Sequence, residues 1–232
     1  VAFESEASDL VAGDRNGVID TFVYDRSSGR VRAATRPGSE PGPVGSRGAA
    51  ISREGRYVAF YTPERYDPAD ADAFGDAYLF DRRTGRREAV SPGTGDCYNQ
   101  LTLALTPRAR HVLHWCNDGL RLYDRGSGEV VPVSPFDPVV SAAGVSADGG
   151  TVVFCTGADQ LEPPGALGDS VFVWRRGGAG PVSLANAGVC TDSATVSADA
   201  RTAIFSATMP GLVPADTGDP RQSDVFAAEP LG

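Results

Sequence analysis

Short, mostly hydrophobic runs recur along this chain, with polar turns between them. The segment "ISREGRYVAFYT" at 51–62 joins small apolar residues, a polar turn and a run whose apolar residues alternate. Two such runs around a short turn are typical of a β-hairpin. The pattern returns at 103–115, 143–155 and 194–206, and its second half alone opens the chain at 1–5. We therefore predict an a–b hairpin in each complete copy and a lone b strand at the N-terminus.

A second phrase follows each of these segments. It reads "DAYLFDRRTGRREAVS" at 76–91, with related copies at 20–35, 119–134 and 169–184 and a shortened copy at 224–232. An alternating run, a turn and a β-rich return predict two further strands, c and d. Gly29, Gly85 and Gly128 close these turns, where a positive φ is accessible at little cost only to glycine.

The two phrases together form a repeating unit of four strands. Equivalent b-strand positions are Phe3, Phe60, His114, Phe154 and Phe205, spaced by 57, 54, 40 and 51 residues. Four-stranded units at intervals of ~40–50 residues indicate a β-propeller, in which neighbouring blades pack face to face. We predict an all-β protein of about 18 strands with almost no helix.

About five blades are expected within a single domain at 1–232. The approximate repeats are 1–47, 48–92, 101–135, 141–185 and 193–232. Five b and c copies but only four a and d copies are present, so the first blade lacks strand a and the last ends in or just after strand c.

The pattern "SxDGRxVAFxS…D.FVYDRxTG…VS" resembles the WD-like (PD40-like) repeat of bacterial TolB-type propellers. The closest copies are "ISREGRYVAFYT" and "DAYLFDRRTGRREAVS", and the opening "ASDLVAGDRNGVIDTFVYDRSSG" is similar to a form found in actinobacterial members. The resemblance covers the whole chain. It implies a secreted, periplasmic or cell-envelope location and a role as a protein-docking scaffold, an envelope component or a regulatory cap on a peptidase.

Composition narrows the classes of partner. The net charge is −9 and the chain has arginine but no lysine. The negative net charge argues against nucleic acid because few phosphate counterions could be released. No apolar run approaches the ~18–20 residues of a transmembrane helix. The N-terminus shows no basic-then-apolar signal, which is compatible with a mature chain that has lost one.

Four cysteines, Cys97, Cys116, Cys155 and Cys190, occur without a CxxC pair. Their even number favours disulfides and an oxidising compartment, with buried thiols as the alternative and zinc disfavoured by the spacing. Cys97 precedes an a strand and Cys116 ends the neighbouring b strand, so these two should pair. Cys155 and Cys190 should form the second bridge.

The predicted loops differ between the two ends of the blades. The a–b and c–d turns are short and share what we call the hairpin face, whereas the b–c and d–a connections share the loop face. The b–c connections are long and varied at 5–19, 62–75, 156–168 and 207–223, but shrink to "NDG" at 117–119. Variable loops on a rigid scaffold are where binding concentrates. Around this short connection we predict a binding site at Tyr98, Asn99, Trp115, Asn117 and Asp118.

One turn and one histidine are candidates for metal binding or catalysis. In "GDRNGVID" at 13–20, Asp14, Asn16 and Asp20 partly resemble a calcium loop, but the terminal glutamate is missing, and a capped Asx turn is the simpler interpretation. His114 replaces an aromatic residue at a core position, so we expect a buried histidine rather than the base of a cysteine nucleophile.

Three functions are compatible with this pattern. The leading hypothesis is a non-catalytic extracytoplasmic propeller that binds a protein or peptide through the loop face, without a cofactor. The alternative is a hydrolase or lyase for carbohydrate or a small molecule that uses loop-face carboxylates as acid and base. The third is a lectin-like protein that stacks a sugar on tryptophan or tyrosine.

Overall fold

The computed structural model describes most of the chain. The described residues are 1–36, 38, 45–68, 70, 74–90, 97, 103–117, 119–134, 140–157, 161, 169–188, 193–208, 212 and 223–229. They form 18 β-strands and no helix, which confirms the predicted all-β class. Accordingly, no helix in this part of the chain is long and apolar enough to span a bilayer.

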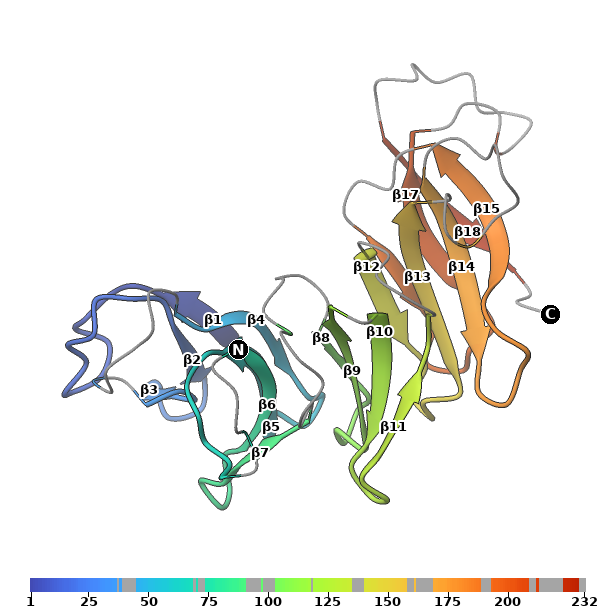
Figure 1. The fold of residues 1–232 in the computed structure, drawn as a ribbon. Coiled ribbons are helices and arrows are strands. Elements are labelled where there is room, and N and C mark those ends of the chain that lie inside the picture. The colour runs from blue at the N-terminus through green and yellow to red at the C-terminus, as the bar shows by residue number, and fades with distance from the viewer. Residues whose placement is uncertain are drawn as a thin grey trace. The chain divides into compact units, whose positions relative to one another are not determined.

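Five antiparallel sheets follow one another along the chain, and we call them blades 1 to 5 (Figure 1). Blade 1 holds β1 (Ala2–Ser5), β2 (Asp20–Asp25) and β3 (Arg30–Ala33), and blade 2 holds β4 (Arg47–Ile51), β5 (Tyr57–Thr62), β6 (Asp76–Asp81) and β7 (Arg87–Ala89). Blade 3 holds β8 (Leu103–Leu105), β9 (His111–Cys116), β10 (Gly119–Asp124) and β11 (Glu129–Pro132). Blade 4 holds β12 (Val140–Val145), β13 (Thr151–Gly157), β14 (Asp169–Arg175) and β15 (Val182–Gly188), and blade 5 holds β16 (Ala194–Val196), β17 (Ala203–Ala207) and β18 (Asp224–Ala228).

Each sheet keeps the order of the chain, so consecutive strands are hydrogen-bonded neighbours. Blades 2 to 4 have the four strands a, b, c and d. In the described residues, blade 1 begins with strand b and blade 5 ends with strand c, as the missing copies of the repeat predict.

A reciprocal pair of hydrogen bonds closes every a–b hairpin and explains part of the repeated phrase. The Ser52 N–H donates to the Tyr57 carbonyl (2.9 Å), and the Tyr57 N–H donates to Ser52 Oγ (3.1 Å). Thr106 and His111 repeat this arrangement in blade 3, Ser146 and Thr151 in blade 4, and Ser197 and Thr202 in blade 5. The hydroxyl residue at the start of the turn therefore supplies an acceptor that the backbone would otherwise lack.

The c–d turns rely on an aspartate and a glycine. The Asp81 carboxylate accepts the Arg83 N–H (2.9 Å), and the Asp81 carbonyl accepts the Gly85 N–H (2.8 Å). Gly29, Gly85 and Gly128 have φ of 67°, 77° and 75°. This confirms the predicted positive φ, which a side chain adopts only with strain.

The chain divides into two compact units, 1–118 with 123–130 and 119–122 with 131–232, and each is described by itself. In the first unit, alternate residues of β5 face opposite ways. Val58 and Phe60 pack against blade 1, whereas Tyr57 and Tyr61 pack toward blade 3. In the second unit, Phe205 of blade 5 packs with Val153 and Val171 of blade 4. Blades within a unit are thus held by buried apolar faces.

Opposed aromatic residues link strands b and c in four blades. The stacked pairs are Phe3–Phe22, Phe60–Tyr78, Phe154–Phe172 and Phe205–Phe226, with ring centroids 5.6–6.5 Å apart. In blade 3 the equivalent b-strand residue is His114, which is fully buried as predicted. Cross-strand aromatic pairs stabilise a sheet beyond simple burial, which accounts for the aromatic spacing in the sequence.

Candidate binding site

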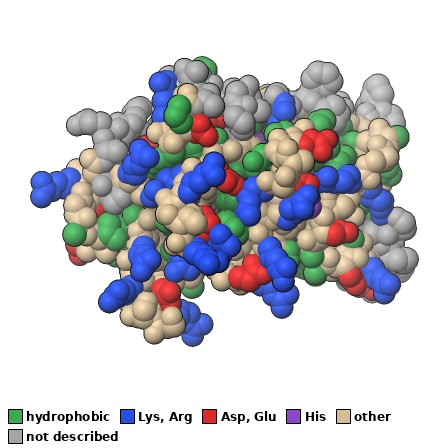
Figure 2. Space-filling view, turned by 90° about the horizontal axis from the view of Figure 1, so that it is seen from below, with side chains coloured by type: hydrophobic (Ala, Val, Ile, Leu, Met, Phe, Trp, Pro, Cys, Tyr) green, Lys and Arg blue, Asp and Glu red, His purple; other side chains and the backbone are tan. Residues whose placement is uncertain are grey.

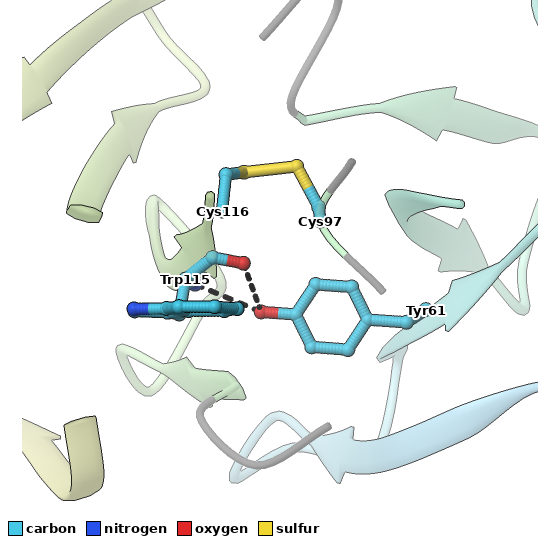
Figure 3. Close-up of a disulfide and its surroundings, with 4 residues drawn as sticks. All are labelled: Tyr61, Cys97, Trp115 and Cys116. Atoms are coloured by element: carbon cyan, nitrogen blue, oxygen red, sulfur yellow. Dashed lines mark hydrogen bonds between the residues drawn. A yellow bond between two sulfur atoms is a disulfide. The ribbon is translucent and has the colours of Figure 1, made fainter. Parts of the chain in front are cut away.

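A disulfide marks the loop face where blades 2 and 3 meet. Cys116 ends β9, and Cys97 lies in the connection between β7 and β8 (Figure 3). The bond between them confirms the first predicted pairing. It ties the segment that enters blade 3 to the end of a buried strand, directly before the short connection at 117–119.

Tyr61, at the loop-face end of β5, adds a second link at this point. Its hydroxyl accepts the Trp115 N–H (2.8 Å) and donates to the Trp115 carbonyl (3.1 Å) (Figure 3). The side chain is 1% exposed, and burial raises the pKa of the Tyr61 hydroxyl well above its ordinary value. The hydroxyl therefore stays protonated and serves as both donor and acceptor for one backbone unit of the next blade.

Two of the five predicted binding residues, Trp115 and Asn117, lie in the described part of the chain, and they differ in exposure. Asn117 is exposed and follows Cys116 directly. Trp115 is only 5% exposed, so its ring is packed inside and is not offered at the surface. Tyr98, Asn99 and Asp118 lie outside the described residues. The sequence reasoning missed Tyr61, although a polar-tipped aromatic at the end of a b strand was a usable signal.

Only one cysteine of the second predicted disulfide lies in the described part of the chain. Cys155, in β13, is fully buried and disulfide-bonded. Its predicted partner Cys190 lies outside the described residues, so this pairing stays a prediction.

The candidate calcium turn at 13–20 is held by its own hydrogen bonds. Asn16 Nδ2 donates to Asp20 Oδ2 (2.8 Å), and Asn16 Oδ1 accepts the Val18 N–H (3.2 Å). Thr35 Oγ1 donates to the other Asp20 oxygen (2.6 Å). Burial, and the neighbouring charge of Asp20, raise the pKa of Asp14. The side chains thus satisfy one another in the manner of an Asx turn.

No group of three or more His, Cys, Asp or Glu residues suited to a metal ion occurs among the residues that the structure describes. His111, the other histidine, begins β9, and its Nε2 lies 3.4 Å from Asp124 Oδ2. The same carboxylate accepts Arg110 Nε (2.6 Å), and this bond holds the pKa of Asp124 well below its ordinary value. His111 is therefore part of an ion-paired hairpin.

The hairpin face of the first unit carries a pocket that sequence reasoning did not identify. It has a volume of about 250 Å³ and lies between blades 2 and 3, lined by Arg56, Tyr57, Leu79, Asp81, Thr84, Arg86, Glu88 and Arg125. The guanidinium carbons of Arg125 and Arg56 lie 4.2 and 4.7 Å from the centroid of the Tyr57 ring. The crowding of arginine in the turns was the available signal.

Comparison with solved structures shows which known fold this chain resembles. No family model matches the sequence, and no curated protein sequence matches it significantly. Among solved structures, TolB from Acinetobacter baumannii superposes with a TM-score of 0.60 at 14% identity, over 98% of this chain and 50% of TolB. The chain therefore has a TolB-like β-propeller fold, as the repeat predicts.

Other similar structures include enzymes. The tricorn protease matches with a TM-score of 0.60 at 14% identity, over 98% of this chain and 22% of the protease. Oligogalacturonate lyase from Vibrio parahaemolyticus matches with a TM-score of 0.55 at 13% identity, over 93% of this chain and 55% of the lyase. The chain thus spans about half of TolB and less of the protease. Because one fold carries several activities, the function must be argued from sites.

Proposed function

We propose that this protein is a non-catalytic extracytoplasmic propeller that binds a protein or peptide through its loop face, around residues 97–99 and 115–118. The observation that carries the proposal is the double anchor at this point, the Cys97–Cys116 disulfide and the Tyr61 hydrogen bonds. The proposed contact residues are Tyr98, Asn99, Asn117 and Asp118, which follow the two bridged cysteines in the chain, whereas Trp115 is buried.

The anchor favours binding for an entropic reason. A loop that is already held in place loses less conformational freedom when a partner docks, so more of the contact energy appears as affinity. The neighbouring Asn117 is exposed and polar, which suits the rim of a protein interface. The disulfide also supports the location, because such bonds persist mainly outside the reducing cytoplasm. The resemblance to TolB-type repeats, whose family includes docking scaffolds, points the same way.

Comparative capture tests the proposal. The wild-type protein and the variants Tyr98→Ala and Asn117→Arg are immobilised and exposed to a periplasmic or extracellular extract, and retained proteins are quantified by mass spectrometry. We expect one protein to be retained by the wild type and lost from both variants. Arg32→Ala is the control, because Arg32 is exposed on the outer strand of blade 1. Equal retention by the loop-face variants and the control would refute a loop-face site.

The Cys97→Ser/Cys116→Ser double variant tests the anchor separately. If preorganisation matters, this variant retains less partner than the wild type at a temperature where both are folded by circular dichroism. Retention equal to that of the wild type would show that the disulfide serves stability alone.

A further inference from the structure

Arginine is concentrated in the turns of the hairpin face. The turn segments of the first unit are 25–30, 52–57, 81–88, 106–111 and 124–129, and they hold 11 of the 21 arginines but only 6 of the 30 carboxylates. The protein as a whole carries a net charge of −9. These turns therefore form a locally basic region on an acidic molecule. Figure 2, seen from below, shows arginine side chains and carboxylates interspersed.

Five of these 11 arginines form ion pairs with carboxylates. The ion pairs are Arg56–Asp81, Arg82–Asp25, Arg108–Glu54, Arg110–Asp124 and Arg125–Glu88, with N–O distances from 2.6 to 3.6 Å. Arg83 and Arg86 belong to the same c–d turn and are both exposed. Neither forms an ion pair with any residue that the structure describes. Arg86 lines the pocket between blades 2 and 3, whereas Arg83 does not.

Tyr57 adds an aromatic ring and a hydroxyl to the charged lining of the pocket. Its side chain is 7% exposed and lines the pocket. Arg56 and Arg125 lie against its ring at cation–π distances. Within the described part of the chain its hydroxyl forms no hydrogen bond, and it is not among the fully enclosed polar atoms, so it reaches solvent. The hydroxyl is thus available to a ligand.

We propose that this pocket binds a carboxylate side chain of an acidic peptide segment. Three arginines and two carboxylates line it, so its net charge of one positive unit matches a single carboxylate better than a dianionic phosphate. Arg86 pairs with the carboxylate, and the Tyr57 hydroxyl donates a hydrogen bond to it. The remaining turn arginines attract the other acidic residues of the segment and accelerate its association. This site lies on the hairpin face and is independent of the loop-face binding proposed above.

The test uses a fluorescein-labelled hexaglutamate peptide, with hexaglutamine as the uncharged comparison, in fluorescence polarisation titrations. We expect hexaglutamate to bind, hexaglutamine not to bind, and the affinity to fall as salt is raised. Arg86→Gln should weaken binding about tenfold, as expected for loss of a charge-assisted hydrogen bond. Arg83→Gln removes the same charge from the same turn outside the pocket, and should change the affinity less than about twofold. Tyr57→Phe should weaken binding severalfold.

Three results would overturn the proposal. Equal losses for Arg83→Gln and Arg86→Gln would show diffuse attraction to the basic turns without a pocket. Absence of hexaglutamate binding by the wild type at low salt would exclude the site. Tighter binding of inorganic polyphosphate than of hexaglutamate at equal charge would reassign the face to phosphate ligands. Unchanged melting temperatures of the three variants ensure that each loss reports binding.

Discussion

At the scale of single residues, this protein depends on hydroxyl and carboxylate groups that complete the backbone at the ends of strands. Tyr61 supplies a donor and an acceptor to one peptide unit of β9. Ser52 closes the a–b turn of blade 2, and Asp81 its c–d turn. Each group stabilises a buried or tightly turned segment whose own polar atoms would otherwise lack partners.

Tyr61→Phe tests the most buried of these groups. The change removes the hydroxyl but keeps the ring, so it leaves the Trp115 N–H and carbonyl without this partner in a buried place. We expect a loss of about 1–3 kcal/mol in the free energy of unfolding, measured by urea denaturation. Tyr24→Phe is the matched control, because Tyr24 is 39% exposed, and it should change stability by less than about 0.5 kcal/mol. Similar losses for both would mean that the Tyr61 hydrogen bonds contribute little.

The turn at 13–20 gives a second prediction at this scale. A calcium ion would have to displace the hydrogen bond between Asn16 and Asp20. At about ten times a dissociation constant of ~10⁻³ M, a bound ion would add about 1.4 kcal/mol of stability. We expect no such rise in melting temperature, and we expect Asn16→Ala to lower stability by about 1 kcal/mol with or without calcium, because two hydrogen bonds of the turn are lost. A calcium-dependent rise that Asp14→Ala abolishes would establish a metal site instead.

At the scale of elements, the strands owe their repeated pattern to packing on two sides. All six residues of β5 are buried, and they alternate between the faces toward blade 1 and blade 3. A strand enclosed in this way reads as a nearly continuous apolar run rather than a strict alternation. The polar residues move into the turns, where the Ser, Asp and Gly positions recur with each blade.

The Cys97–Cys116 disulfide joins such elements and yields the third prediction. Closing a loop of 19 residues stabilises the folded chain by about 3 kcal/mol in the loop-entropy estimate. Cys97→Ser/Cys116→Ser should therefore lower the unfolding free energy by about that amount in urea. Reductant should destabilise the wild type at least as much. If reductant has no effect on the wild type, the bond does not form in solution.

Thiol titration gives an independent check on both bridges. The unfolded, unreduced protein should show no reactive thiol if Cys155 pairs as predicted with Cys190. Four reactive thiols would contradict both disulfides and weaken the proposed extracytoplasmic location.

At the scale of the whole molecule, charge is distributed unevenly. The turns of the hairpin face gather arginines, yet the protein is acidic, with an isoelectric point near 4.7. Several carboxylates on this face have depressed pKa values. The hydrogen bond from Arg56 holds the pKa of Asp81 at about 2 against an ordinary 3.8, and the hydrogen bond from Ser27 holds that of Asp25 at about 2.

These shifts predict acid sensitivity. A carboxyl group with a lower pKa in the folded state stabilises the protein above its unfolded pKa, near 4, and this contribution is lost as the pH falls toward 2. The urea midpoint of the wild type should therefore fall between pH 4 and pH 2. Asp81→Asn cannot titrate, so its midpoint should be lower at pH 7 and decline less over this range. An equal decline in both proteins would show that the Arg56–Asp81 pair does not contribute.

Much of the fold was predictable from the sequence. The hydroxyl, aspartate and glycine positions recur because each turn needs the same local hydrogen bonds, and the strand pattern recurs because each blade packs against the next. The first disulfide was also predictable, since strands a and b of one blade are neighbours. Such features depend on interactions close in the sequence or repeated along it.

The binding residues were less predictable. Trp115 is a large aromatic beside a predicted loop, and nothing local distinguishes a ring that docks a partner from one that fills the core. The structure buries it. The pocket at Arg56, Arg86 and Arg125 is formed by residues from two blades, so its existence depends on how their turns pack.

The sequence by itself determined the blade repeat, the turn chemistry, the positive-φ glycines and the Cys97–Cys116 pair, because short-range geometry and periodic burial dictate them. Only the tertiary structure decided that Tyr61 bonds the backbone of the next blade and that Trp115 is buried. It also placed Tyr57 against Arg56 and Arg125 with its hydroxyl free of partners among the described residues. The Tyr61–Trp115 and Tyr57–Arg125 contacts join residues more than 50 positions apart, and they depend on inter-blade packing that no local pattern encodes.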